Sequence, residues 1–286
     1  MNLGKTIQIY IPDGNPRSVK IAEITSRTVQ AILIPRSQLD YATSRDELNN
    51  VGIYFLIGNP DDEIEASLYV GEAEDCLTRL KQQNKVKDWW NVALAIVSKT
   101  KYFTKTHIKY LEWYCYLEAE KARRYHLDNS TVPTRPFVSE PIEADLLDNF
   151  DTIKTLVSTL GYPIFDQIKK PEEKDILICK GKEAYAKGQY TEDGLVVFAG
   201  SKCNLKETRT AGSSIVATRK RLINDGILIH DVNVYKFTSN RIFSSPSLAA
   251  ATVLARSANG WIEWKYKNGK TLDEVKRQNL TDKESD

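Results

Sequence analysis

The chain has 286 residues, of which 41% are hydrophobic and 27% charged, and its net charge at pH 7 is +2. This length allows two domains with sizeable cores, and the composition is that of a globular protein and not of a disordered or collagen-like one. No apolar run approaches the ~18 residues of a membrane span and the first residues lack the pattern of a secretory signal, so we expect a cytoplasmic protein with no membrane partner.

The cysteines and histidines exclude the commonest zinc sites. The four cysteines are far apart in the sequence and form no C-x-x-C pair, and the chain has three histidines. A structural zinc site or a histidine cage is therefore not expected. We expect the cysteines to be reduced thiols; they are Cys76, Cys115, Cys179 and Cys203.

The first half of the chain predicts strands and helices in alternation. Residues 1–45 contain two alternating runs, TIQIYI and VQAILI, and predict a β-rich N-terminal segment followed by a short helix near Ser44. The next predicted elements are strands at 52–57 and 66–71 joined by the turn NPDDE, a helix at 72–83, a strand in WNVALAIV and a long helix at 104–124. The proline-rich run TVPTRPFVSEPIEADL then predicts an extended exit from a domain at 46–145.

The second half predicts a separate α+β domain. A linker with a short helix is expected at 146–164, the domain itself at 165–276 and a flexible polar tail at 277–286. The domain contains predicted strands in LVVFAG and VYKFT, helices in SSIVATRKRLINDG and SSPSLAAATVLARSANG, and an alternating run WIEWKYKNGKTL that turns at its Asn-Gly pair.

Each of the two strands at 52–57 and 66–71 contains a tyrosine between apolar residues, Tyr54 in GIYFLI and Tyr69 in SLYVG. Because successive side chains of a strand point to opposite faces, we expect both phenols on the same face of a hairpin. Gly52 and Gly71 beside them allow a close backbone approach. Each tyrosine alone is more often a half-buried strand aromatic than a functional residue.

Several features in a fixed order favour a functional interpretation. The tripeptide GIY at 52–54, then YVG at 69–71, then Arg79 ten positions after Tyr69, resemble the GIY-YIG nuclease family. The family has a carboxylate on a later helix, which KYLEWYCYLEAEKA supplies, and a downstream asparagine, which is Asn129 in LDNSTVP. The resemblance implies a small three-stranded antiparallel sheet surrounded by helices, with the site residues on one concave surface.

Two glutamates of the long helix are candidates for the carboxylate. On a helical wheel, Glu112 and Glu118 flank the apolar arc on opposite sides, so the geometry does not choose between them. The family places its glutamate directly after an aliphatic residue, and this resemblance points to Glu112, which follows Leu111. The other glutamates of the helix are expected to be solvated charges.

The resemblance also implies a mechanism. Glu112 would ligate a divalent cation, Mg²⁺ or Mn²⁺, and Arg79 would hold the phosphate through its two-pronged guanidinium. Tyr54 is the expected base for the attacking water, Tyr69 would orient that water, and Asn129 would anchor the chain after the helix. A free phenol has a pKa of ~10, so a base at Tyr54 needs a nearby cation.

Two residues depart from the family pattern. Many members carry a basic residue directly after the second motif, where this chain has Glu72, and a His or Tyr four residues after the arginine, where it has Gln83. The expected function is a metal-dependent endonuclease that hydrolyses DNA phosphodiester bonds. The alternatives are a weak or inactive nucleic-acid-binding protein and a nuclease that acts on RNA.

The C-terminal half resembles a domain of unknown function that recurs after GIY-YIG nucleases, and one associated with restriction and DNA-methylation systems. The resemblance covers roughly 195–275 and depends on the S-P-S-x-A-A and N-G-W segments. It implies a targeting or nucleic-acid-binding domain. A basic cluster and tryptophans that could stack on bases agree with this, although both are equally typical of a solvated helix face and a core; these residues are Arg219, Lys220, Arg221, Trp261 and Trp264.

Overall fold

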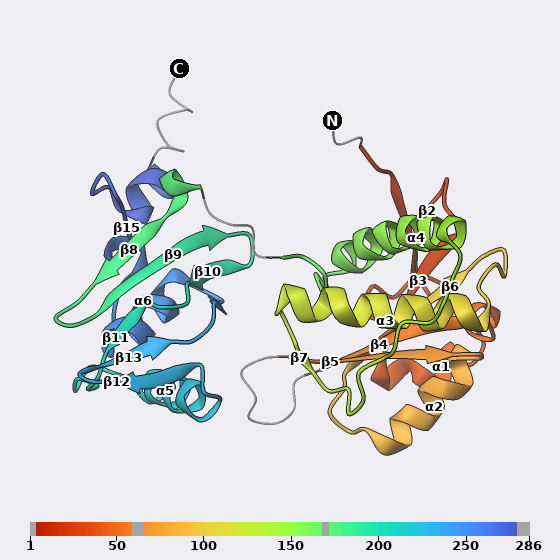
Figure 1. Ribbon diagram of the computed structural model, residues 1–286, viewed down its shortest axis with the longest axis horizontal. Helices are drawn as coiled ribbons and strands as arrows, with labels where there is room; N and C mark the ends of the chain where they lie inside the picture. The colour runs from red at the N-terminus through yellow and green to blue at the C-terminus, as the bar shows by residue number, and fades with distance from the viewer. Residues whose placement is uncertain (1–3, 59–65, 168–171, 279–286) are drawn as a thin grey trace. The chain divides into compact units, whose positions relative to one another are not determined.

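The computed structural model describes residues 4–58, 66–167 and 172–278 (Figure 1). The chain divides into two compact units, Met1–Ile168 and Lys169–Asp286. Each unit combines a sheet with helices, so the α+β class predicted from the sequence is confirmed. Within the described residues, no helix has the length and apolar character needed to cross a membrane. The predicted turn NPDDE and residues 279–286 of the predicted tail lie outside the described residues.

The first unit is built on one seven-stranded sheet. Its strand order is β1-β2-β3-β6-β4-β5-β7, and its neighbours are antiparallel except for the parallel pair β5 and β7. The strands are β1 (Ile7–Tyr10), β2 (Lys20–Ile24), β3 (Val29–Pro35), β4 (Gly52–Gly58), β5 (Ser67–Ala73), β6 (Val92–Ser98) and β7 (His126–Leu127).

The N-terminal strands extend the sheet that contains the two tyrosine motifs, which is therefore larger than the three strands expected. Strand β3 pairs with β6 along seven residues, from Val29 opposite Ser98 to Pro35 opposite Val92. Most residues of β3 are buried on both sides, so this strand requires a neighbour on each edge and a layer on each face. Residues 1–45 are thus part of the first unit and not a separate lead-in.

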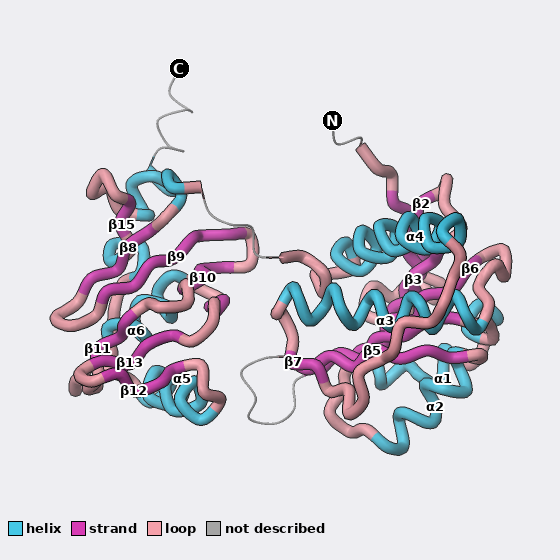
Figure 2. The backbone as a smooth tube through the Cα atoms, in the orientation of Figure 1, coloured by secondary structure: helices cyan, strands magenta, loops and turns pink. Residues whose placement is uncertain are grey.

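Two cores cover the two faces of this sheet. One face, which includes Ile53 and Phe55, packs under α3 and α4, and the other, which includes Tyr54 and Leu56, packs against α1 and α2. Figures 1 and 2 show these helices on the two sides of the strands. The helices are α1 (Leu39–Ala42), α2 (Cys76–Val86), α3 (Lys105–Ala122) and α4 (Glu140–Thr159).

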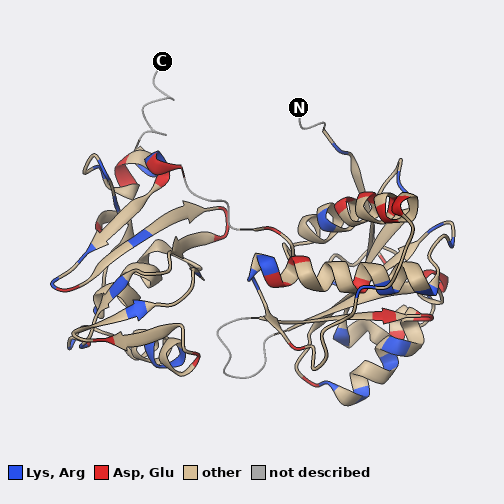
Figure 3. Ribbon diagram, in the orientation of Figure 1, with Lys and Arg blue, Asp and Glu red and all other residues tan. Residues whose placement is uncertain are grey.

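Helix α4 begins six residues before the segment 146–164, which was expected to be a linker with a short helix. Pro141 lies in its first turn, where the missing N–H has no helical partner to lose, and Glu140 and Glu143 favour the positive end of the helix dipole. An apolar face with Phe150 and Ile153 joins the core of the first unit. The segment expected to be a linker is therefore part of the packed first unit. Figure 3 shows that most of the charged residues of α4 are Asp or Glu.

The second unit has an eight-stranded sheet of order β12-β13-β11-β9-β10-β14, with β8 paired to β9 and β15 paired to β8. Its strands are β8 (Leu177–Lys180), β9 (Tyr185–Thr191), β10 (Gly194–Val197), β11 (Lys202–Asn204), β12 (Leu228–Asp231), β13 (Val234–Phe237), β14 (Arg241–Phe243) and β15 (Lys265–Tyr266). Its helices are α5 (Ser213–Asn224), α6 (Pro246–Leu254) and α7 (Gly260–Glu263).

The S-P-S and N-G-W segments join α6 to α7. The Gly260 amide donates to Ser247 Oγ at 3.1 Å, and a Cβ at Gly260 would lie 2.0 Å from the carbonyl carbon of Pro246. The buried Trp264 indole donates to the Pro246 carbonyl at 3.2 Å. Asn259 caps α7, so the start of the run predicted as a strand is helical.

Candidate active site

Tyr54 and Gly71 pair directly across the hairpin of β4 and β5. A Cβ at Gly71 would lie 2.5 Å from both Cζ and Oη of Tyr54, so the phenol ring crosses the strand where residue 71 has no side chain. Gly52 is similarly constrained, because a Cβ there would lie 2.3 Å from the carbonyl oxygen of Ile96. Both glycines of the two motifs thus serve close packing.

The two tyrosines lie on the same face of the sheet, as expected. Their ring centroids are 5.9 Å apart and the rings are tilted by 33°. They differ in accessibility, because Tyr54 is 1% exposed while Tyr69 is half-buried. Tyr69 is therefore the phenol that a molecule arriving from solvent can reach.

Helix α2 holds the Tyr54 hydroxyl. Asp75 caps this helix by accepting from the Thr78 amide at 2.6 Å, and two turns later Gln83 Nε2 donates to Tyr54 Oη at 3.0 Å. Burial raises the pKa of Tyr54, and the neighbouring Tyr69 raises it further, while Gln83 and Arg79 act in the opposite direction. The net shift of the Tyr54 pKa is upward, so burial opposes the ionisation that a base at this position requires.

Glu112 lies half-buried on α3, beside the edge of β5. Burial and the carboxylate of Glu72 raise the pKa of Glu112 to about 7. A hydrogen bond from the Glu72 amide, together with the charges of Lys109 and Arg79, opposes this rise. Glu72, which stands where many members of the GIY-YIG family are basic, is therefore an electrostatic neighbour of Glu112.

Helix α3 packs on the face of the sheet opposite to the core under α2, which contains Tyr54 and Tyr69. Glu112 itself lies within hydrogen-bond reach of the Glu72 amide on β5, so the shared concave surface stays a prediction. Which face a helix covers depends on how the chain crosses the sheet, and the motif residues do not determine it. Arg79 connects the two sides, because it lowers the pKa of both Tyr54 and Glu112.

Asn129 anchors the chain after α3. Its Oδ1 accepts from the Val70 amide at 3.0 Å and its Nδ2 donates to the Val70 carbonyl at 2.8 Å. The side chain thus bonds to the outer edge of β5 as a further strand residue would, next to the parallel pairing of β7. This geometry agrees with an anchoring role and involves no reacting group.

Glu118, the other carboxylate considered, is paired on its own helix. Its Oε1 accepts from Lys121 Nζ at 2.6 Å, one turn further along α3. Such a pair is typical of a solvated helix face. Its contacts agree with the interpretation given to the remaining glutamates of this helix.

Lys87 is a neighbour of the tyrosine pair that the sequence analysis did not identify. Its Nζ lies 4.6 Å from the centre of the Tyr69 ring and 5.8 Å from that of Trp89, and it forms an ion pair with Asp128. The spacing of Arg79, Gln83 and Lys87 at intervals of four residues was the available signal, because such residues share one stripe of a helix.

The donors near Glu112 suit a hard cation with few protein ligands. The carboxylates there are those of Glu112 and Glu72. Among the described residues, no group of three or more His, Cys, Asp or Glu side chains is arranged to hold a metal ion. Mg²⁺ commonly binds through one or two carboxylates, with water and substrate phosphate as its other ligands. The donor set fits Mg²⁺ or Mn²⁺ in that mode and does not fit a closed zinc cage.

Arg219 in the second unit is not an exposed basic residue, which corrects its predicted place in the nucleic-acid-binding cluster. It is fully buried on α5, where Nε donates to Glu207 at 2.9 Å. Its other nitrogens donate to three backbone carbonyls, those of Thr252 at 2.5 Å, Asn204 at 2.7 Å and Leu205 at 3.2 Å. The guanidinium therefore organises the interior, while Lys220 and Arg221 are exposed.

The two tryptophans considered for base stacking have different environments. Trp264 is fully buried and belongs to the core, so it is not available for stacking. Trp261 is partly exposed and contacts the Tyr190 ring edge-on at 5.4 Å. The Arg277 guanidinium lies 3.5 Å from the centre of the Trp261 ring. One aromatic of the pair thus stays a candidate.

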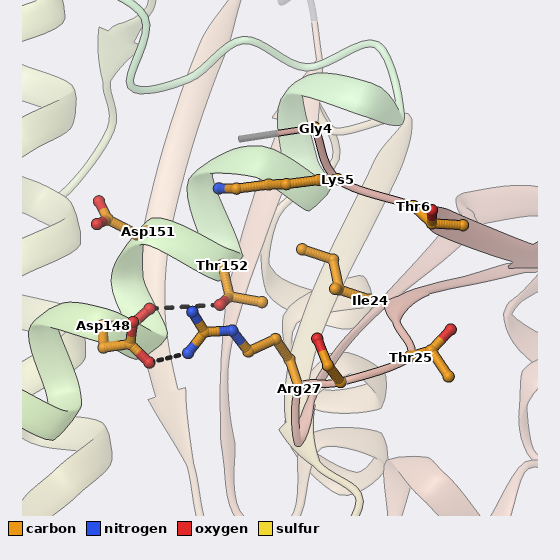
Figure 4. A pocket seen from close by; sticks show the side chains of 10 residues that line it. Gly4, Lys5, Thr6, Ile24, Thr25, Arg27, Asp148, Asp151 and Thr152 are labelled. Carbon is orange, nitrogen blue, oxygen red and sulfur yellow. Dashed lines mark hydrogen bonds and ion pairs between the residues drawn. The ribbon is translucent and has the colours of Figure 1, made fainter. Parts of the chain in front are cut away.

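A polar cleft of about 440 Å³ lies between the N-terminal segment and α4 of the first unit. Figure 4 shows Arg27 directed toward Asp148, with which it forms an ion pair, and Lys5 extended across the same cleft. Residues of the tyrosine motifs, Arg79 and Glu112 are not among those that line it. The cleft is therefore separate from the candidate active site.

Comparison with curated proteins and with solved structures finds no match for this chain. Comparison with family models finds a match in the second unit. Residues 177–276 match the sequence model of a family described as a domain of unknown function, DUF4357. This range agrees with the C-terminal domain of unknown function that the S-P-S and N-G-W segments predict.

Proposed function

We propose that the first unit is a divalent-metal-dependent endonuclease of the GIY-YIG type that hydrolyses DNA phosphodiester bonds, and that the DUF4357 domain supplies binding or targeting. The observation that carries this proposal is the position of Arg79. One exposed guanidinium lies within electrostatic reach of Tyr54 and of the half-buried Glu112. A phosphate bound at Arg79 would therefore lie near both motif regions.

Arg79 binds the phosphate in this proposal. A planar guanidinium donates two parallel hydrogen bonds to a phosphate, which fixes both its position and its orientation. The arginine is placed for this by the Asp75 cap, since it follows the cap by four residues and its amide donates to the Asp75 carbonyl at 3.1 Å. The helix start thus sets the position of the guanidinium relative to the hairpin.

Glu112, with Glu72 beside it, would hold the cation. The chemistry that a bound Mg²⁺ or Mn²⁺ supplies is stabilisation of negative charge on the phosphate and the leaving oxygen. Burial makes the ionised form of Glu112 unfavourable without a partner, so the carboxylate is poised to gain from a cation. This is the physical reason for a glutamate at the rim of an apolar helix face.

Tyr69 is the phenol assigned to the attacking water. Hydrolysis joins the water oxygen to phosphorus and breaks the bond from phosphorus to the leaving oxygen. The proton that the water loses passes to the Tyr69 oxygen in its deprotonated form, and the leaving oxygen takes a proton from solvent. Tyr69 is half-buried and accessible, whereas Tyr54 is enclosed and bonded to Gln83. Tyr54 then positions Tyr69 through ring contact, which revises the roles that the family resemblance implies for the two residues.

A cleavage assay on the full chain tests the proposal. Plasmid DNA and branched DNA are incubated with Mg²⁺ or Mn²⁺, and a chelator serves as the metal-free control. Cleavage is expected only with metal, and Glu112→Ala is expected to abolish it while DNA binding persists. Glu118→Ala is the matched control on the same helix and should cleave normally. Arg79→Lys should fail, because an ammonium lacks the two-pronged grip.

The second candidate is a nucleic-acid-binding protein that does not cleave. Two observations favour it: Glu72 adds negative charge beside Glu112, and burial opposes the ionisation of Tyr54. An unaltered chain that binds DNA but leaves it intact with either metal would support this candidate. Cleavage of RNA but not DNA in the same assay would instead assign the site to RNA.

A further inference from the structure

Helix α2 directs three polar side chains toward the tyrosine pair. Arg79, Gln83 and Lys87 follow one another at intervals of four residues, so they lie along one stripe of the helix and its C-terminal cap. Gln83 donates to Tyr54 at 3.0 Å, and Lys87 Nζ lies 4.6 Å from the centre of the Tyr69 ring. The stripe therefore carries a cation at each end and a hydrogen-bond donor between them.

The Lys87 ammonium stays at the surface with partners that can be exchanged. Its side chain is 20% exposed, and that of its ion-pair partner Asp128 is 35% exposed. The backbone of Asp128 donates to the Leu68 carbonyl at 2.9 Å, which fixes the acid at the edge of β5. Both side chains keep access to solvent, so a phosphate can compete with the carboxylate for the ammonium.

We propose that Lys87 binds a nucleic-acid phosphate that flanks the scissile one, and that Asp128 holds Lys87 until the substrate replaces it. This inference rests on the proposed nuclease function. Lys87 caps α2 eight positions after Arg79, which corresponds to ~12 Å along the helix axis. Phosphates of one strand of duplex DNA advance by ~3.4 Å along its axis per nucleotide. The two cations therefore contact different phosphates of one strand.

This arrangement separates binding from chemistry. Arg79 acts on the reacting phosphate, whereas Lys87 holds the strand a few nucleotides away. Loss of Lys87 should therefore raise KM, because it removes binding energy from the strand beside the reacting phosphate. Tyr69 lies under Lys87, so a strand that runs from Lys87 to Arg79 would pass the half-buried phenol.

The two members of the ion pair provide the test, because they are expected to act in opposite directions. The full chain is titrated with a short DNA duplex in chelator-containing buffer at several salt concentrations, and fluorescence anisotropy gives Kd. Lys87→Met retains the aliphatic stem that packs on Tyr69 and Trp89. It should weaken binding and reduce the slope of log Kd against log salt by about one. Lys87→Arg should restore both.

Asp128→Asn should bind DNA more tightly than the unaltered chain, because Lys87 no longer has to leave a carboxylate. If the ion pair is only structural, Lys87→Met and Asp128→Asn would lower the Tm together and leave Kd and its salt slope unchanged, which overturns the inference. A chain that cleaves DNA but shows this result retains the proposed function without the Lys87 contact. A chain that neither binds nor cleaves DNA loses both.

Discussion

The phenol of Tyr54 occupies the space that a side chain at Gly71 would need, with Cζ and Oη each 2.5 Å from where a Cβ would stand. Gly71→Ala should therefore destabilise the first unit by about 1–3 kcal/mol, the usual cost of overpacking a core. Chemical denaturation measures this loss. In the double variant Tyr54→Leu, Gly71→Ala the penalty of the alanine should largely disappear, since the clashing ring is gone. Equal penalties in both backgrounds would show that the ring does not hold this position.

Replacement of each tyrosine by phenylalanine should separate their roles. Tyr69→Phe removes the accessible hydroxyl and should lower the cleavage rate by ~10²–10⁴, the range for loss of a general base. Tyr54→Phe removes a buried hydroxyl that accepts from Gln83 and should cost about 1 kcal/mol of stability, with less than tenfold loss of rate. Initial rates and thermal unfolding provide the comparison. If Tyr54→Phe instead lost more activity than Tyr69→Phe, Tyr54 would be the general base.

Glu112 should make the metal-free protein less stable as the pH rises. Its pKa is about 7 in the folded chain, against the usual 4.5. Between these values the folded state binds more protons than the unfolded state, so the free energy of unfolding falls from pH ~4.5 to ~7 and levels off above pH 7. Glu112→Gln should remove about 1–3 kcal/mol of this loss. Thermal unfolding with a chelator at several pH values measures it, and parallel curves for both proteins would contradict the assignment.

Substitution of Arg219 should affect the stability of the second unit, whereas substitution of its neighbours Lys220 and Arg221 should not. Arg219→Met removes the donor to Glu207 and to three carbonyls, and should destabilise the second unit by about 3 kcal/mol or more. The pair Lys220→Ala, Arg221→Ala should leave the unfolding of that unit within about 0.5 kcal/mol. If Lys220 and Arg221 contact DNA, the double variant should show a shallower slope of log Kd against log salt than the unaltered chain. Denaturant unfolding and DNA titration distinguish the two effects, and an equally stable Arg219→Met would refute the structural role.

Much of the local geometry of the candidate site could be predicted from the sequence pattern alone. The alternation in GIYFLI and SLYVG predicted that both phenols share a face, and the expected helix start set Arg79 beyond the hairpin. Asn129 was predicted to anchor the chain, and its bonds to Val70 agree with that role. These features depend on neighbouring residues, whose geometry is fixed by the strand and helix periods.

Long-range pairing and helix placement were beyond the sequence patterns. Nothing local to VQAILI indicates that it pairs with the strand after α2, and the motif residues do not specify which face α3 covers. The run Arg219, Lys220, Arg221 was interpreted as one cluster. The spacing of Ile215, Arg219 and Leu222, all buried on α5, was a usable sign that the arginine points inward.

The pairing of β3 with β6 affects how the region with the two tyrosine motifs can be isolated. A fragment that begins at residue 46 would lack β1, β2 and β3, and the backbone amides and carbonyls of β6 facing them would have no partner. The exposed edge would carry the sequence VALAIVS, which is apolar and rich in β-branched residues. An unpaired, apolar edge strand of this kind tends to pair with strands of other molecules. Residues 46–145 alone should therefore associate or precipitate, while a fragment spanning 4–167 should remain monodisperse in size-exclusion chromatography.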